Sequence, residues 1–206
     1  MSFASVSFLL FFLVVLLLLL LVQRVLPFAE IKRRIICQGI LLIASYVFYG
    51  WWNMRLCLLL MGITWISFFT AVKKDEKHLR QSRISLLIGV GTPLAVLGIF
   101  KYYDFFVTSF CDVFHLTPGV LNLILPVGIS FYTFQLLSYV VDVYRGTIQA
   151  QKNIFHLALY ISFFPQLIAG PIVKYHDVCE QIGNRQCTAE GMAYGIKRFS
   201  YGLAKK

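Results

Sequence analysis

Residues 8–22 read FLLFFLVVLLLLLLV, an uninterrupted apolar run close to the amino terminus. Apolar residues flank it on both sides, so residues 3–26 reach the length of about 20 residues that a helix needs to cross a bilayer. No Lys or Arg precedes the run, and no small-residue cleavage site follows it. A secretory signal peptide would have both. The run therefore predicts a retained first transmembrane helix.

The composition extends this reading to the whole chain of 206 residues, of which 59% are hydrophobic and 14% charged. An ordinary soluble domain has about 25% charged residues. A soluble core of this size could not hide so much apolar surface, which excludes a soluble globular protein and a disordered one. The net charge of +10 comes mostly from Lys and Arg in short loops. We interpret it as topology information and contact with anionic lipid, and expect no nucleic-acid partner.

Further apolar stretches predict the rest of the architecture, an all-α polytopic protein with about six membrane segments. Residues 1–206 would form a single transmembrane region. Thr188 is a plausible N-cap for an amphipathic helix over residues 188–206. Residues 101–118 read either as a helix extension or as an interfacial segment. The expected spans after the first are residues 35–52, 56–72, 84–100 (interrupted by Pro93), 121–144 (opening with Pro126 in the first helical turn) and 154–173.

Loop charges predict the orientation of these spans. Residues 24–34 carry four basic residues and one acidic residue, and residues 73–83 carry five basic and two acidic. Two spans separate the loops, so both lie on one side, which the positive-inside rule makes the cytoplasm. The N-terminus would then lie outside. The second span ends in an aromatic cluster expected at the headgroup level, formed by Tyr46, Phe48, Tyr49, Trp51 and Trp52.

Polar residues form a stripe along the span that covers residues 126–146. Helical spacings of 4 and 3 align Gly128, Tyr132, Gln135, Tyr139, Asp142 and Gly146, with Ser138 and Arg145 beside them. Such a stripe is too costly to expose to lipid, so it must face other helices or a water-filled cavity. It is either a packing face, in which Asp142 and Arg145 could pair, or the wall of a substrate cavity.

The stretch FFPQLIAGPIV at residues 163–173 predicts irregular backbone within the last apolar segment. Pro165 lacks a backbone donor and clashes with the preceding helical turn, and Gly170 and Pro171 interrupt the segment again. Irregular backbone survives at membrane depth only where protein buries it or where it lines a cavity. The segment is therefore broken or re-entrant, with a kinked span as the alternative.

Cysteines and histidines provide no further site. The cysteines contain no CxxC pair, which favours free apolar thiols over a disulfide framework, and we predict no metal site. His78, His115, His156 and His176 read as ordinary surface or boundary residues. The scattered cysteines are Cys37, Cys57, Cys111, Cys179 and Cys187.

Several motifs together resemble the membrane-bound O-acyltransferase family, in its alginate O-acetyltransferase branch. The longest are LPVGISFYTFQLLSYVVDVYRG at residues 125–146 and FFPQLIAGPIVKY at residues 163–175. FKYYDFF at residues 100–106, YGLAKK at residues 201–206 and the stretch from Tyr49 to Trp51 also match, in order.

The resemblance implies the N-terminal half of a bacterial cytoplasmic-membrane acyltransferase, whose helices form a ring around a central tunnel. Such an enzyme takes an acyl group, here acetyl, from a thioester or an acyl carrier, with no bound cofactor. It delivers the group to a hydroxyl of alginate or another exported acceptor, with possible partner proteins outside the membrane. We predict that its substrate cavity is lined by Tyr132, Gln135, Ser138, Tyr139, Asp142, Arg145 and Gln166.

The family's catalytic histidine is expected beyond Lys206, so no residue of this chain is assigned a catalytic role. We expect residues 1–206 to insert in the membrane but to be inactive alone. The alternatives are a transporter or channel subunit, which broken helices also suggest, and a non-catalytic membrane scaffold. Uptake of an unchanged solute would indicate a transporter, acylated product an acyltransferase, and neither a scaffold.

Overall fold

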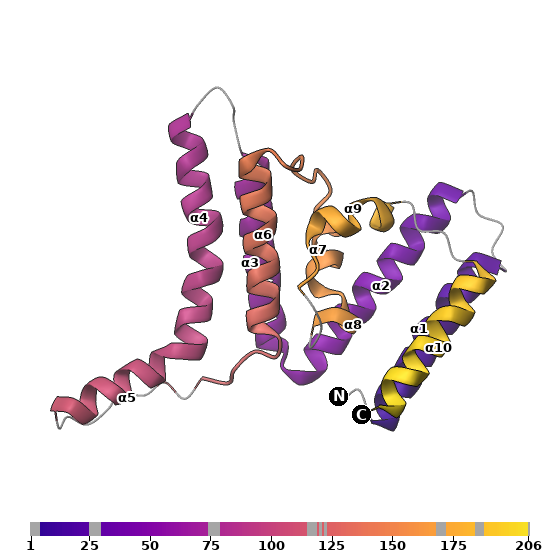
Figure 1. Ribbon diagram of the computed structural model, residues 1–206, viewed down its shortest axis with the longest axis horizontal. Helices are drawn as coiled ribbons and strands as arrows, with labels where there is room; N and C mark the ends of the chain where they lie inside the picture. The colour runs from indigo at the N-terminus through magenta and orange to yellow at the C-terminus, as the bar shows by residue number, and fades with distance from the viewer. Residues whose placement is uncertain are drawn as a thin grey trace.

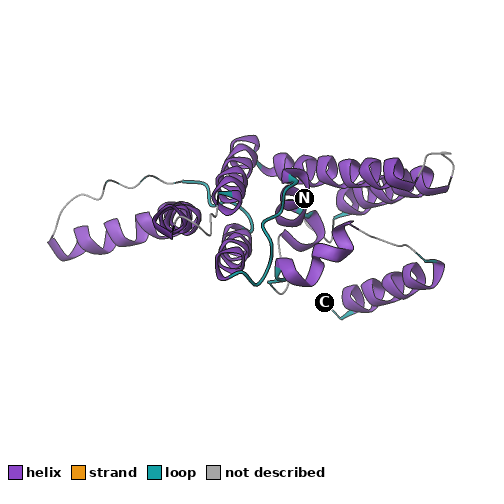
Figure 2. Cartoon of the chain, turned by 90° about the horizontal axis from the view of Figure 1, so that it is seen from above, coloured by secondary structure: helices purple, strands orange, loops and turns teal. Residues whose placement is uncertain are grey.

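A computed structural model describes residues 5–24, 30–73, 79–114, 119, 121, 123–167, 172–183 and 188–205. All regular elements within these ranges are helices, with no strand among them (Figure 2). Helices α1 (Val6–Arg24), α2 (Glu30–Trp52) and α3 (Met54–Val72) and the stretch Arg83–Phe114 are long and apolar enough to cross a membrane. The all-α polytopic prediction is confirmed.

Charged residues extend α2 beyond the predicted span. The helix begins at Glu30, in the segment expected to be a loop, rather than at residue 35. Glu30 suits the positive end of the helix dipole, and its carboxylate lies 3.8 Å from the guanidinium of Arg34 one turn later. Helix α3 starts after Asn53, whose side chain accepts a hydrogen bond from the Arg55 backbone N–H. Local capping therefore sets these boundaries.

The fourth predicted span is longer and more continuous than its glycines and proline suggest. Helix α4 (Leu79–Leu97) contains Pro93 without a break, which corrects the predicted interruption. It passes through a π-helical turn, η1 (Gly98–Tyr102), directly into α5 (Tyr103–Phe114). In Figure 1, α5 leaves the lower end of α4 at a steep angle and projects away from the other helices.

The helix ends that flank the basic loops lie on the same side of the molecule. Figure 1 shows the end of α1, the start of α2, the end of α3 and the start of α4 along its upper edge. The turn at Asn53 and the start of α5 lie at the lower edge. The described part of the chain thus confirms that the two basic regions share a side, although residues 25–29 and 74–78 lie outside it.

Helix α6 (Ile129–Arg145) lies at the centre of the structure and packs against α3 and α4. It starts later than residue 121, and Pro126 lies before it rather than in its first turn. The reason is Gly128, the N-cap, whose φ of 75° is left-handed and cannot continue a helix. Gly146 ends the helix in the same conformation, with φ 79°.

The last predicted span is a re-entrant segment. Helix α7 (Ile154–Ser162) ends at Phe163, just before Pro165, and the short α8 (Phe164–Leu167) follows. The freed backbone N–H of Phe164 donates to Ser45 Oγ of α2, 3.3 Å away. Residues 168–171, which include Gly170 and Pro171, lie outside the described chain.

Hydrogen bonds place the two ends of this segment together. Gln151 Nε2, before α7, donates to the hydroxyl of Tyr175, the first residue of α9 (Tyr175–Gly183), at 2.6 Å. The hydroxyl of Tyr160 in α7 donates to the Val173 carbonyl at 2.6 Å. The two ends of the segment thus lie together, as a re-entrant segment requires, and α2, α3 and α6 bury α7.

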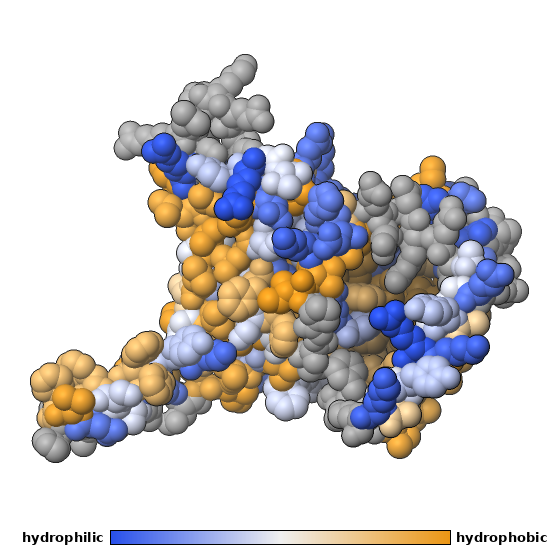
Figure 3. Space-filling view, viewed as in Figure 1, coloured by the Kyte–Doolittle hydropathy of each residue, from blue (hydrophilic) through white to orange (hydrophobic). Residues whose placement is uncertain are grey.

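Apolar side chains divide between a protein core and an uncovered surface. The core runs between α2, α3, α4, α6 and α7. The Leu-rich surface of α1 and the outer faces of α3 and α4 are exposed, and Figure 3 shows an apolar middle with hydrophilic residues gathered at its upper edge. The amphipathic helix is confirmed as α10 (Ala189–Ala204), with Thr188 Oγ1 accepting from the Gly191 N–H at 3.1 Å.

Candidate functional site

The predicted polar stripe lies on the buried face of α6, although not at the centre of that face. Tyr132 and Tyr139 are fully buried and Gln135 is 2% exposed, whereas Phe134 is 46% exposed. Leu136, Val140 and Val143 are buried as well. The centre of the buried face of α6 therefore lies between these apolar residues and the polar stripe. Ser138 and Asp142 therefore lie at its margin and are half-buried, and Arg145 is exposed.

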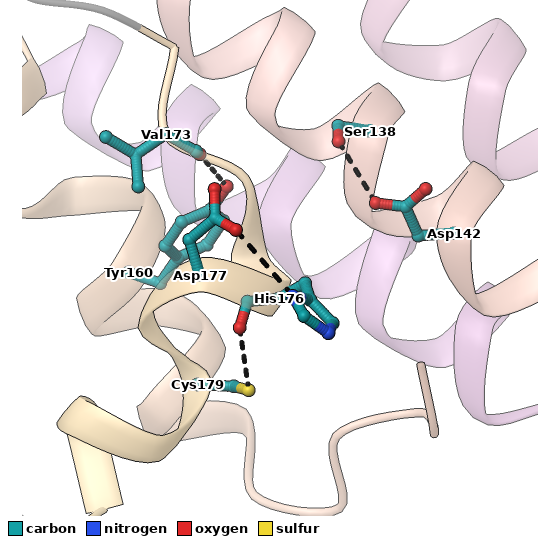
Figure 4. A network of polar contacts seen from close by, with 7 residues as sticks. All are labelled: Ser138, Asp142, Tyr160, Val173, His176, Asp177 and Cys179. Carbon is teal, nitrogen blue, oxygen red and sulfur yellow. Dashed lines mark hydrogen bonds and ion pairs between the residues drawn. The ribbon is translucent and has the colours of Figure 1, made fainter. Parts of the chain in front are cut away.

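Polar groups toward the C-terminal end of α6 have hydrogen-bond partners. The Tyr139 hydroxyl accepts from the Gln151 backbone N–H at 2.9 Å, and Ser138 Oγ donates to Asp142 Oδ2 at 3.3 Å. Gln151 also bonds to the Tyr175 hydroxyl, which links α6 through Tyr139 to the start of α9. The bond of Tyr160 to Val173 lies within the re-entrant segment, and Figure 4 shows it apart from the pair of Ser138 and Asp142 on α6. We call these residues the partnered cluster: Ser138, Tyr139, Asp142, Gln151, Tyr160 and Tyr175.

Asp142 and Arg145 are not joined among the ion pairs of the described residues. The Asp142 carboxylate instead accepts from Ser138, one turn earlier on the same helix. Arg145 extends into solvent beside the left-handed Gly146. The suggested pairing of Asp142 with Arg145 therefore does not explain the stripe.

A second group of polar side chains is buried without partners. Each carries a side-chain oxygen or nitrogen that is shielded from solvent and has no hydrogen-bond partner within the described ranges. Leaving such an atom unpaired costs about 1–3 kcal/mol, so each one calls for an explanation. We call this group the unpartnered set: Ser67, Thr133, Gln135 and Gln166. The buried hydroxyls of Tyr49 and Tyr132 instead interact with each other, and that of Ser162 interacts with Tyr46.

The aromatic cluster at the end of α2 divides between the surface and the protein interior. Tyr49 is 3% exposed and Phe48 4%, whereas Trp51 and Trp52 are exposed at 67% and 58%. The headgroup level of the cluster stays a prediction, because burial against protein does not fix depth in a membrane. These two rings lie on the side of α2 that packs against protein, and Tyr49 belongs to the same core as Tyr132.

Close backbone contact holds α8 against the start of α6. A Cβ added at Gly128 would lie 2.3 Å from the Leu167 carbonyl oxygen, closer than any side chain tolerates. Gln166 is the neighbour of Leu167, and Tyr132 follows Gly128 by one helical turn. The contact therefore fixes the relative position of two helices that each carry unpartnered polar atoms.

The described histidines have polar contacts of their own. His156 Nε2 lies 3.1 Å from Gln38 Oε1, and Gln38 Nε2 donates to the Ile182 carbonyl, which links α7, α2 and α9. His176 is exposed beside Asp177 (Figure 4). His78, His115 and Cys187 lie outside the described chain, and no disulfide joins the four cysteines within it.

Sequence reasoning missed Thr133, Ser162, Tyr49 and Ser67 as buried polar residues. Thr133 and Ser67 are hydroxyl residues inside apolar helices, a signal present in the sequence but shared by many packing residues. Tyr49 and Ser162 could not be distinguished from their neighbours, because their burial depends on how α2, α6 and α7 pack.

Comparison with known proteins reveals clear relatives. The chain is 40% identical, over 81% of its length, to the probable alginate O-acetylase AlgI of Pseudomonas putida and to that of Pseudomonas aeruginosa. It is 34% identical, again over 81%, to the peptidoglycan O-acetyltransferase of Helicobacter pylori. The matched region spans 36%, 33% and 37% of these relatives, about a third of their length. The resemblance to the alginate O-acetyltransferases is confirmed.

Two other comparisons give no match. No family model and no solved structure matches the chain. The similarity to O-acetyltransferases therefore rests on the curated relatives, and it agrees with the membrane helices described above.

Proposed function

We propose that this chain is part of a membrane-bound O-acyltransferase that transfers acetyl groups to an exported, hydroxyl-bearing polysaccharide. The observation that carries the proposal is the 40% identity to probable alginate O-acetylases over 81% of the chain. The acceptor is alginate or another cell-envelope polymer, since one relative is named for peptidoglycan. The donor is an acyl thioester or an acyl carrier, and no bound cofactor takes part.

The unpartnered set is the part of the structure that best fits such substrates. Thr133 and Gln166 carry unpaired groups able to donate a hydrogen bond, and Gln135 carries an unpaired acceptor oxygen. Donors can bind an acyl carbonyl and stabilise negative charge that develops on its oxygen. Acceptors can orient a hydroxyl. The surrounding apolar core would keep water from a reactive thioester.

The catalytic proton acceptor is not assigned within this chain. An acyl transfer to a hydroxyl needs a base within hydrogen-bond reach of that hydroxyl. His156 is already engaged with Gln38, and His176 is exposed beside Asp177. We therefore assign to the unpartnered set the binding and orientation of substrate, and assign the base to no residue of this chain.

We also propose an orientation in the bacterial cytoplasmic membrane. The helix ends beside the basic regions face the cytoplasm, and the N-terminus lies outside. The test uses single cysteines in a cysteine-free background, at exposed Lys32 near the start of α2 and at exposed Met54 near its other end. A membrane-impermeant thiol reagent should label M54C in intact cells and K32C only after permeabilisation. Labelling of K32C in intact cells would contradict the orientation.

The re-entrant segment also favours a second candidate function, a transporter subunit, because broken helices at membrane depth occur in transporters. The discriminating experiment deletes the gene in its own host and restores it. Acetyl content of the exported polysaccharide should fall on deletion and return on restoration, with labelled acetyl groups bound covalently. Loss of solute uptake with unchanged acetylation would favour the transporter. Loss of neither would favour a scaffold.

A further inference from the structure

Helix α5 carries an aromatic face that no other part of the described chain covers. Phe106, Phe110, Val113 and Phe114 follow one another at helical spacing and are 65%, 59%, 73% and 58% exposed. The polar residues Asp104, Thr108 and Asp112 follow at the same spacing on the other side. Figures 1 and 2 show the helix as an arm that extends away from the bundle, and Figure 3 shows this arm as mostly hydrophobic.

Length prevents α4 and α5 from crossing the bilayer as one rod. The apolar helical stretch Arg83–Phe114 has 32 residues. At about 1.5 Å per residue it would measure about 48 Å, against a hydrocarbon core of about 30 Å. Since α4 alone, with 19 residues, nearly spans that core, the residues of α5 must be placed elsewhere.

A bend at the end of α4 accounts for the difference between the length of the helical stretch and the thickness of the hydrocarbon core. The π-helical turn η1 lies at the end of α4, and π-turns allow sharp changes of helix direction. Lys101, Tyr102 and Tyr103 are exposed at this bend. Tyrosine rings and lysine amines prefer the membrane–water interface, so the chain turns at headgroup level.

Leu121, a described residue beyond α5, contacts the polar side of the helix. Asp104 Oδ1 accepts a hydrogen bond from the Leu121 backbone N–H at 2.8 Å. The aromatic stripe is therefore left uncovered by this contact. Exposed apolar residues also occur on the helices before it, with Leu87 of α4 71% exposed and Ile99 of η1 49%.

We propose that α5 lies flat in the membrane surface, with the stripe of Phe106, Phe110, Val113 and Phe114 inserted between lipid chains. The leaflet is the one opposite the basic helix ends. Helices that bind the anionic cytoplasmic leaflet carry Lys and Arg on their polar face. Helix α5 has none between Tyr103 and Phe114, and instead carries Asp104 and Asp112.

The test measures lipid contact position by position in the full chain. Single cysteines at Phe106, Phe110 and Phe114, and at Thr108 and Asp112, are spin-labelled in a cysteine-free background. The protein is reconstituted in vesicles of phosphatidylethanolamine and phosphatidylglycerol. Collisions with oxygen, which concentrates in lipid, should exceed collisions with a water-soluble nickel chelate at the three phenylalanine positions. The order should reverse at Thr108 and Asp112, by about tenfold in the ratio.

Two controls make the result decisive. A label at Leu87 on α4 reports correct insertion of the same background, because that position should contact lipid in every variant. In intact cells, D112C should react with an impermeant reagent while K32C does not. Equal collision ratios on both faces, immobilised labels shielded from both reagents (which would indicate a protein partner), or labelling of D112C and K32C from the same side would each overturn the proposal.

Discussion

The partnered cluster and the unpartnered set are both polar and both include residues of α6, but only the first has hydrogen-bond partners for its buried polar atoms. In the partnered cluster, hydroxyls, amides and the Asp142 carboxylate bond to one another and to backbone groups at 2.6–3.3 Å. In the unpartnered set, buried oxygens and nitrogens are left without a partner. In folded proteins most buried polar atoms have a hydrogen-bond partner. The hydrogen bonds of Gln151 hold the re-entrant segment to α6, and we propose that the unpartnered set binds substrate.

The largest expected effect comes from breaking the contact that keeps α8 against α6. Gly128→Ala places a Cβ at 2.3 Å from the Leu167 carbonyl oxygen and forces alanine to a φ of 75°. We expect a loss of stability of about 3 kcal/mol or more, combining strain and displacement of α8. The measurement is thermal unfolding of the purified protein in detergent.

Gly146→Ala is the matched control for this variant. It imposes a similar left-handed φ of 79° at an exposed position. The loss of stability should be close to the backbone strain alone, about 1 kcal/mol. If both variants lost the same stability, the contact between Gly128 and Leu167 would have no special role.

The next effect comes from the partnered cluster. Gln151→Ala removes the bond from Nε2 to the Tyr175 hydroxyl and the bond that Oε1 accepts from the Asn153 N–H. We expect a loss of about 1–3 kcal/mol, with acyl transfer falling in proportion to the folded fraction. Gln149→Ala, at an exposed neighbouring position, should change neither. Loss of transfer in a fully stable Q151A protein would move the cluster from a structural to a functional role.

Much of this architecture could be predicted from the sequence, because apolar runs report spans directly. The break at Phe163 also followed from Pro165, since proline disturbs the turn before it. The partner of a polar residue could not be predicted. Whether the Tyr139 hydroxyl has a hydrogen-bond partner depends on the position of Gln151, which the turn after Gly146 sets. The burial of Tyr49 likewise depends on the packing of α2.

A smaller effect on stability, but a large one on function, is expected from substitutions at Gln135. Gln135→Leu replaces an unpaired buried acceptor by an apolar group of similar size and should leave stability unchanged within about 1 kcal/mol. Acyl transfer should fall about tenfold or more. Phe134→Ala, on the exposed face of the same helix, serves as the comparison. Equal loss of transfer in the two variants at equal expression would reduce the stripe to a packing face.

The most direct test of the account pairs two measurements on one variant, Thr133→Val. It removes a single hydroxyl that is fully buried and unpaired, and keeps the branched shape of the side chain. The unfolding temperature and the transfer of labelled acetyl groups to exported polysaccharide are measured on the protein expressed from its own gene. The account predicts unchanged or slightly higher stability together with acetyl transfer lowered about tenfold or more. Unchanged transfer, or a loss of transfer matched by a loss of stability, would contradict it.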